Sequence, residues 1–154
     1  MVAKITTPHR IKDALNYNES KVQKGQAECL LAANYLQEPK SMSFYQKLAG
    51  FENLNMLNDR AITKTIHVSL NFDPREKLSK EVLATIAADY MRSIGFAKQP
   101  YLVYQHLDAG HPHIHIVSTT IQDDGRRIST HNIGRDRSEK ARKEIESCYN
   151  LMKA

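Results

Sequence analysis

The chain has 154 residues, of which 41% are hydrophobic and 25% charged, so it can form one ordinary globular core. Its formal net charge is +5 and its isoelectric point about 9.2, which favours a polyanionic partner. Cys29 and Cys148 exclude a zinc ribbon by their spacing, and no stretch suits a signal peptide or a transmembrane helix. We therefore expect a cytoplasmic protein that is not bound to a membrane.

Apolar periodicity predicts two helices and a strand in the first half of the chain. A modest stripe that includes Val22 and Leu30 predicts a helix over residues 19–37, stopped by Pro39. A short helix over residues 41–49 is expected to end at Gly50, and strict alternation predicts a strand over residues 62–72.

The second half begins with a helix and continues with strands joined by tight turns. Ser79 is a suitable N-cap for a helix that runs to about residue 94. The pattern then predicts, in chain order, strands over residues 101–107, 111–121 and 126–129, with turns at 108–110 and 123–125, and a final helix over 138–152. Hairpins cannot build an all-parallel sheet, so we expect an α+β domain with a mainly antiparallel sheet and helices packed on one face.

Histidines mark the strand predicted over residues 111–121. Four of the seven histidines lie between His106 and His115. His111, His113 and His115 alternate with apolar residues, so they share one face of the strand, and His106 can reach that face across the turn. Neutral imidazole is a common ligand of divalent transition metals, and three with open positions are typical of a catalytic site. We predict a metal site at His106, His113 and His115.

Each of three other residues near the predicted site has alternative roles. His111 shares the histidine face, but it can equally contact a phosphate, support a ligand or face solvent. Asp108 can hydrogen-bond a ligand imidazole or serve only as a turn residue. His67 can accept a proton or hold a phosphate, unless its strand turns Val68 toward the open face instead.

The histidine run, His-x-Asp-x-x-His-Pro-His-x-His from residue 106, resembles the third motif of conjugative relaxases, the mobilization nucleases of the HUH endonuclease superfamily. Residues 65–74 (TIHVSLNFDP) resemble the preceding strand of that family, and residues 122–128 (QDDGRRI) the hairpin that follows. Residues 15–22 (LNYNESKV) resemble the first motif, which carries a nucleophilic tyrosine. The resemblance covers nearly the whole chain.

The resemblance implies a single nicking-endonuclease domain over residues 1–154, either complete or excised from a longer protein. It implies that a tyrosine attacks one DNA strand at a transfer origin, forms a 5′-phosphotyrosine, and can later rejoin the strand. The expected cofactor is Mn²⁺ or Mg²⁺, with Zn²⁺, Ni²⁺ or Co²⁺ as alternatives. The expected partners are single-stranded DNA with an adjacent hairpin, together with accessory mobilization and coupling proteins.

Seven tyrosines compete for the role of nucleophile. Tyr17 lies in a polar stretch that we expect just before a helix, where nothing apolar would bury it, and we favour it. Tyr104 is a competitor because it shares the face of His106. Among the basic residues, those that we expect to contact the DNA backbone are Arg126, Arg127, Lys21 and Lys24.

Two other functions remain open. One is another HUH nuclease, a replication initiator or single-strand transposase, in which the nucleophile follows the histidines and would here be Tyr149. The other is a non-catalytic DNA-binding module that keeps the metal as a structural clamp.

Overall fold

The computed structural model describes all residues from 1 to 154. In chain order its elements are β1 (Val2–Thr6), α1 (Ile11–Gln23), β2 (Ala27–Ala33), η1 (Pro39–Ser41), α2 (Phe44–Asn55), β3 (Thr65–Asn71), α3 (Lys80–Ser93), β4 (Tyr101–His106), β5 (His113–Thr119), η2 (Gly134–Ser138) and α4 (Glu139–Cys148). No helix combines the length and the apolar character that crossing a membrane requires.

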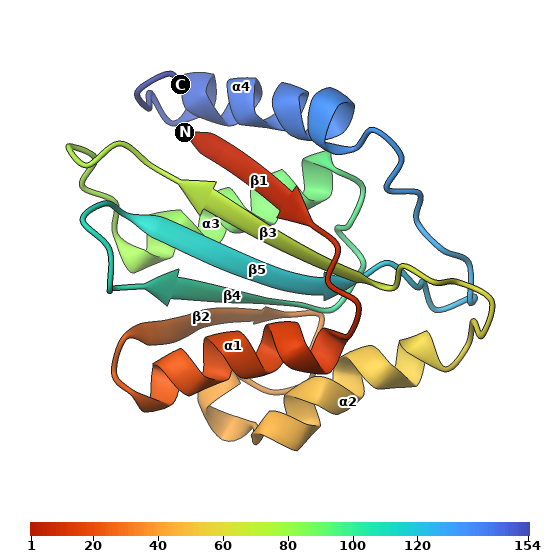
Figure 1. Cartoon of the computed structure of the whole chain (residues 1–154). Coiled ribbons are helices and arrows are strands. Elements are labelled where there is room, and N and C mark those ends of the chain that lie inside the picture. The colour runs from red at the N-terminus through yellow and green to blue at the C-terminus, as the bar shows by residue number, and fades with distance from the viewer.

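The five strands form one sheet in the order β1-β3-β5-β4-β2, and every neighbouring pair is antiparallel (Figure 1). The hairpin between β4 and β5 lies inside this sheet, so both of its strands are supported on their outer sides. The predicted α+β class with an antiparallel sheet is confirmed.

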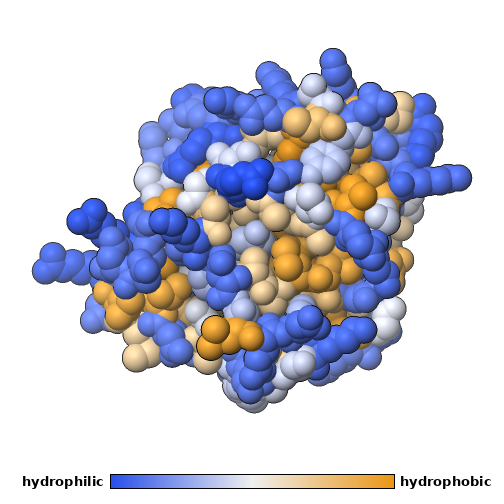
Figure 2. Space-filling model, turned by 180° about the vertical axis from the view of Figure 1, so that it is seen from behind, coloured by the Kyte–Doolittle hydropathy of each residue, from blue (hydrophilic) through white to orange (hydrophobic).

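The helices cover both faces of the sheet, so the expectation that they pack on one face was wrong. Val103 and Ile116 face a core with α3 and α4, whereas their neighbours Leu102 and Val117 face a smaller core with α1 and α2. At these residues the central strands β4 and β5 carry apolar side chains on both faces, so helices must pack against each face of the sheet. Seen from behind, exposed apolar side chains are interspersed with hydrophilic ones, as on an ordinary globular surface (Figure 2).

The helix predicted over residues 19–37 does not form. Helix α1 starts eight residues earlier, at Ile11, and the chain turns at Gly25, which has a φ of +71°. Ala27–Ala33 then forms the edge strand β2, paired with β4 through a register shift between Cys29 and Leu31. Its alanines and leucines are good helix formers, but pairing with β4 overrides that local preference.

Other element boundaries also shift. Helix α2 begins at a capping box formed by Ser43 and Gln46 and continues through Gly50 to Asn55. Gly50 does not end this helix; the Tyr35 ring occupies the space that a side chain there would need. The strand predicted over residues 126–129 is reduced to one bridge between Ile121 and Arg127. Helix α4 is shorter than predicted, whereas Ser79 caps α3 as expected.

Candidate metal centre and nucleophile

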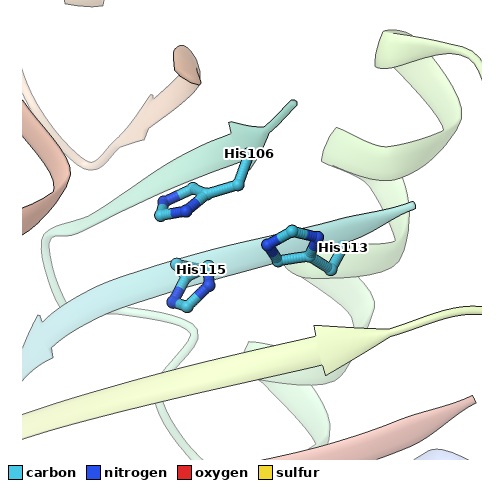
Figure 3. A group of neighbouring side chains, drawn as sticks. All are labelled: His106, His113 and His115. Atoms are coloured by element: carbon cyan, nitrogen blue, oxygen red, sulfur yellow. The ribbon is translucent and has the colours of Figure 1, made fainter. Parts of the chain in front are cut away.

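Three histidines come together on one face of the central hairpin. His106 lies directly opposite His113 in the β4–β5 register, and His115 is two residues further along β5 on the same face. One ring nitrogen from each of His106, His113 and His115 lies within 4.8 Å of the others. Figure 3 shows the three rings projecting from these neighbouring strands into one space. This is the arrangement that the period of two along β5 predicted.

Each of the three rings is held by a hydrogen bond on one nitrogen. His113 Nδ1 donates to the carbonyl oxygen of His111 at 3.2 Å, and His115 Nδ1 is 3.0 Å from His67 Nε2. His106 Nε2 is 2.7 Å from Asn18 Oδ1. Such bonds fix the orientation of imidazoles and leave the other nitrogen available to a metal.

The electrostatics of the cluster suit a cation. Burial lowers the pKa of His106 to about 4, and with the neighbouring histidines and Lys21 it lowers that of His115 to about 3. Both rings are therefore neutral at pH 7 and carry a free lone pair. His106 Nδ1 is buried and has no hydrogen-bond partner within the protein. An orphaned nitrogen beside two further imidazoles fits a divalent transition-metal ion, and the donor set favours Mn²⁺, Zn²⁺, Co²⁺ or Ni²⁺.

His67 faces the cluster, while Val68 is buried in the core with α3. Of the two neighbours, His67 therefore lies on the histidine face of the sheet and Val68 on the opposite face. Burial lowers the pKa of His67 to about 4. His111 plays a different part from its neighbours, because its ring nitrogen Nε2 contacts Asn71 Oδ1 at 3.2 Å and only its carbonyl supports His113.

Tyr17 lies over this cluster. Its ring centroid is 5.9 Å from that of His106, 6.0 Å from His115 and 6.2 Å from His67, and 46% of the residue is exposed. Tyr17 lies inside α1, whereas the sequence predicted a position just before a helix. That prediction was wrong. The tyrosine is about half exposed because it lies on the flank of α1, beside the buried stripe that includes Ile11 and Leu15 and within reach of the histidines.

The competing tyrosines are placed differently. Tyr104 is fully buried beneath α1 and α2, and burial raises the pKa of its hydroxyl well above the usual range. Tyr149 packs against the core on the other face of the sheet, where its hydroxyl donates to Asp89 of α3. Neither hydroxyl can meet a substrate at the histidine cluster.

Lys21 connects the nucleophile candidate to the hairpin turn. Its Nζ is 5.1 Å from the centroid of the Tyr17 ring and 2.6 Å from Asp108 Oδ2. The hydrogen bond with Asp108 raises the pKa of Lys21, so the amine stays charged. Of the two roles considered for Asp108, the hydrogen bond to a ligand imidazole is not present, because its carboxylate pairs with Lys21 instead.

A polar cavity of about 200 Å³ opens beside His115, and its lining includes Lys4, Thr6, His67 and Ser69. The lining combines the ammonium of Lys4, the hydroxyls of Thr6 and Ser69, and two imidazoles, and such donors can bind a phosphate group. Larger cavities of about 470 and 440 Å³ lie along α1 and α2 and contain none of the clustered histidines.

The basic residues expected to contact DNA are spread over the molecule. Lys24 is exposed at the end of α1. Arg126 and Arg127 follow the far end of β5, at least about 20 Å from His113 at 3.3 Å per strand residue. Arg127 donates to the carbonyl of Thr63 and so holds the chain before β3, whereas Arg126 extends into solvent.

Asn18 makes a hydrogen bond to His106 and was not predicted from the sequence as a site residue. It is fully buried between α1 and His106. The signal was present, because Ile11, Ala14, Asn18 and Val22 recur at helical spacing, which places an amide on an otherwise apolar stripe. Thr6 and Ser69, which line the cavity beside His115, were not predicted either.

Comparison with known proteins agrees with this geometry. No curated protein matches the chain. A family model described as Relaxase, MobA/VirD2-like, nuclease domain, matches residues 17–151, a match that includes Tyr17 and all three clustered histidines. Because the match covers most of the sequence, the chain belongs to the MobA/VirD2-like relaxase nuclease family.

Proposed function

We propose that this protein uses Tyr17 to nick one DNA strand at a transfer origin during mobilization of a plasmid or an integrated element. Membership of the relaxase nuclease family implies DNA nicking in broad terms. The observation that carries the finer proposal is the position of Tyr17, exposed and about 6 Å from the rings of His106 and His115.

The reaction is a transfer of a phosphoryl group to tyrosine. The Tyr17 oxygen forms a bond to phosphorus while the bond between phosphorus and the 3′ oxygen breaks. The phenolic proton is lost, and the departing 3′ oxygen gains one. The products are a 5′-phosphotyrosine and a free 3′ hydroxyl, and reversal of the same step rejoins the strand.

The surrounding side chains favour this step. A tyrosine with a pKa near 10 is a poor nucleophile at neutral pH, and the ammonium of Lys21 beside the ring stabilises the developing phenolate. His67 holds the ring of His115, and Lys4 with Ser69 offers contacts to the neighbouring phosphate.

Relaxase nucleases depend on a metal ion, and His106, His113 and His115 can hold one. When bound there, a divalent ion supplies Lewis-acid polarisation of a phosphate oxygen. Mn²⁺ and Mg²⁺ are the ions that we propose for the cell, and softness of the ligands favours Mn²⁺ of the two.

The DNA partner is single-stranded DNA at an origin, and we propose an adjacent hairpin as part of the recognised element. Arg126, at the far end of β5, is exposed and suited to backbone phosphates outside the nicking site. Accessory mobilization and coupling proteins are the further partners that this role requires.

The experiment is a nicking assay on labelled single-stranded oligonucleotides that span candidate origins, with Mn²⁺ present. Tyr17→Phe should abolish cleavage, whereas Tyr45→Phe, which removes the hydroxyl of an exposed tyrosine on α2, should cleave like the wild type. A chelator should stop the reaction. Cleavage by Tyr17→Phe at the wild-type rate would contradict the proposal. Tight metal binding without cleavage of any oligonucleotide would favour the DNA-binding module.

A further inference from the structure

Asn18 joins the helix of the nucleophile to the metal centre. It follows Tyr17 directly in α1, it is fully buried, and its side-chain oxygen is 2.7 Å from Nε2 of His106. No other side chain of α1 makes a hydrogen bond to a clustered histidine. A polar group at this depth must have partners, so the contact is a constraint on both residues.

The orientation of the Asn18 amide follows from its second contact. Its Nδ2 donates to the carbonyl oxygen of Ala14 at 2.9 Å. A carbonyl only accepts, so the amide nitrogen faces Ala14 and the amide oxygen faces His106. That oxygen also only accepts, and therefore Nε2 of His106 carries the proton.

The consequence for His106 is a lone pair on Nδ1. This nitrogen is buried and has no partner in the protein. His113 is held in the opposite sense, because its Nδ1 donates to the carbonyl of His111 and leaves Nε2 free. The two ligands that face each other across the hairpin thus offer different ring nitrogens.

We propose that Asn18 is a positioning residue that holds His106 in the Nε2-protonated tautomer and so presents Nδ1 to the metal ion. The inference rests on the metal centre of the proposed function. Because Asn18 and Tyr17 are consecutive, a shift of α1 that displaces the nucleophile also releases His106. The nucleophile and the metal centre are therefore coupled through one amide.

The tautomer can be measured without any metal. Long-range ¹H–¹⁵N NMR spectra of the metal-free wild type at pH 7.5 distinguish the protonated from the bare ring nitrogen, and His106→Asn and His113→Asn variants assign the two rings. The expected result is a protonated Nε2 on His106 and a protonated Nδ1 on His113. A protonated Nδ1 on His106 would overturn the proposal.

Metal affinity gives the second readout, by calorimetric titration of Mn²⁺. Asn18→Leu removes the acceptor at similar volume and should weaken binding by about 10- to 100-fold, as is usual when such a supporting contact is lost. Asn18→Asp restores an acceptor and should stay within about threefold of the wild type. Asn16→Leu, the same change at an exposed position of α1, is the matched control and should bind normally.

The outcomes separate the two proposals. Unchanged affinity in a folded Asn18→Leu variant, or an equal loss in Asn18→Asp, would refute the role of Asn18. If Asn18→Leu fails to fold, the role of Asn18 is still tested by the His106 tautomer in the wild type and by the Mn²⁺ affinity of Asn18→Asp. A wild type that binds no Mn²⁺ would contradict the metal centre, while its NMR spectrum would still test the role of Asn18.

Discussion

Lys21 follows Tyr17 by one helical turn, and this spacing places a positive charge beside the ring of the proposed nucleophile. The lysine is held in turn by Asp108, so its position depends on the hairpin that also carries the histidines. A group preorganised in this way stabilises charge that develops during a reaction. The pair would therefore support the proposed nucleophile without contacting the histidines that we propose as metal ligands.

We predict that Lys21→Met slows formation of the DNA adduct by about 10- to 100-fold, somewhat less than the loss of a full oxyanion-hole donor. Lys21→Arg keeps the charge and should retain most of the activity. Single-turnover rates at saturating oligonucleotide measure the effect, with Lys98→Met, an exposed lysine between α3 and β4, as the control. Equal rates for Lys21→Met and Lys98→Met would show that the charge is unimportant.

The histidines of the hairpin should differ in their effects on metal binding. His113→Ala removes a ligand and should abolish Mn²⁺ binding at micromolar protein. His111→Ala leaves the backbone carbonyl that supports His113 in place, and removes only a ring that contacts Asn71. We expect its affinity to stay within about tenfold of the wild type. A complete loss in His111→Ala would make His111 a ligand in place of one of the three.

Helix α1 carries the proposed nucleophile and is anchored by its apolar stripe. Leu15 is fully buried among Leu48, Phe51 and Val117, and the buried ion pair between Glu19 and Lys47 ties α1 to α2 at 2.8 Å. The position of Tyr17 over the sheet depends on this packing more than on the residues around the tyrosine.

Leu15→Ala should therefore lower the free energy of unfolding by about 2–5 kcal/mol, the usual result of deleting a fully buried leucine side chain. Leu36→Ala is the matched control, because Leu36 is fully exposed and its loss should change stability by less than about 0.5 kcal/mol. Urea denaturation of both variants measures the difference. Similar midpoints for the two would mean that α1 is not packed as described.

At the scale of the whole molecule, neutral buried histidines link stability to pH. Burial lowers the pKa of His67 and His106 to about 4 and that of His115 to about 3, from an ordinary value of 6.5. As the pH falls below 6.5, the unfolded chain binds protons that the folded protein does not. The stability present above pH 6.5 is thus lost progressively as the pH falls, down to about pH 4 for His67 and His106 and about pH 3 for His115.

Urea denaturation of the metal-free protein at pH 7.5, 6.0, 5.0 and 4.5 should show this decline. His115→Asn removes the ring with the most strongly lowered pKa, so the variant should lose less stability over the same range. An identical pH dependence in the wild type and the variant would indicate that carboxylates account for the decline.

Local patterns predicted some parts of this molecule and not others. The period of two along residues 111–117 predicted which histidines share a face, because strand geometry alone determines it. Residues 19–37 were predicted wrongly because their helical propensity is opposed by pairing of β2 with β4, which no local pattern records. The helical spacing indicated that Asn18 is buried, but no local pattern records its contact with His106, which lies 88 positions away in the sequence.

We propose Tyr17 as the residue that forms the covalent bond to DNA. Incubation of the wild type with Mn²⁺ and origin oligonucleotides, followed by peptide mass spectrometry of the trapped adduct, tests it most directly. We expect a nucleotide mass on the peptide that contains Tyr17, at that residue, and none in the presence of a chelator. A modified Tyr104, Tyr149 or any residue other than Tyr17 would contradict it.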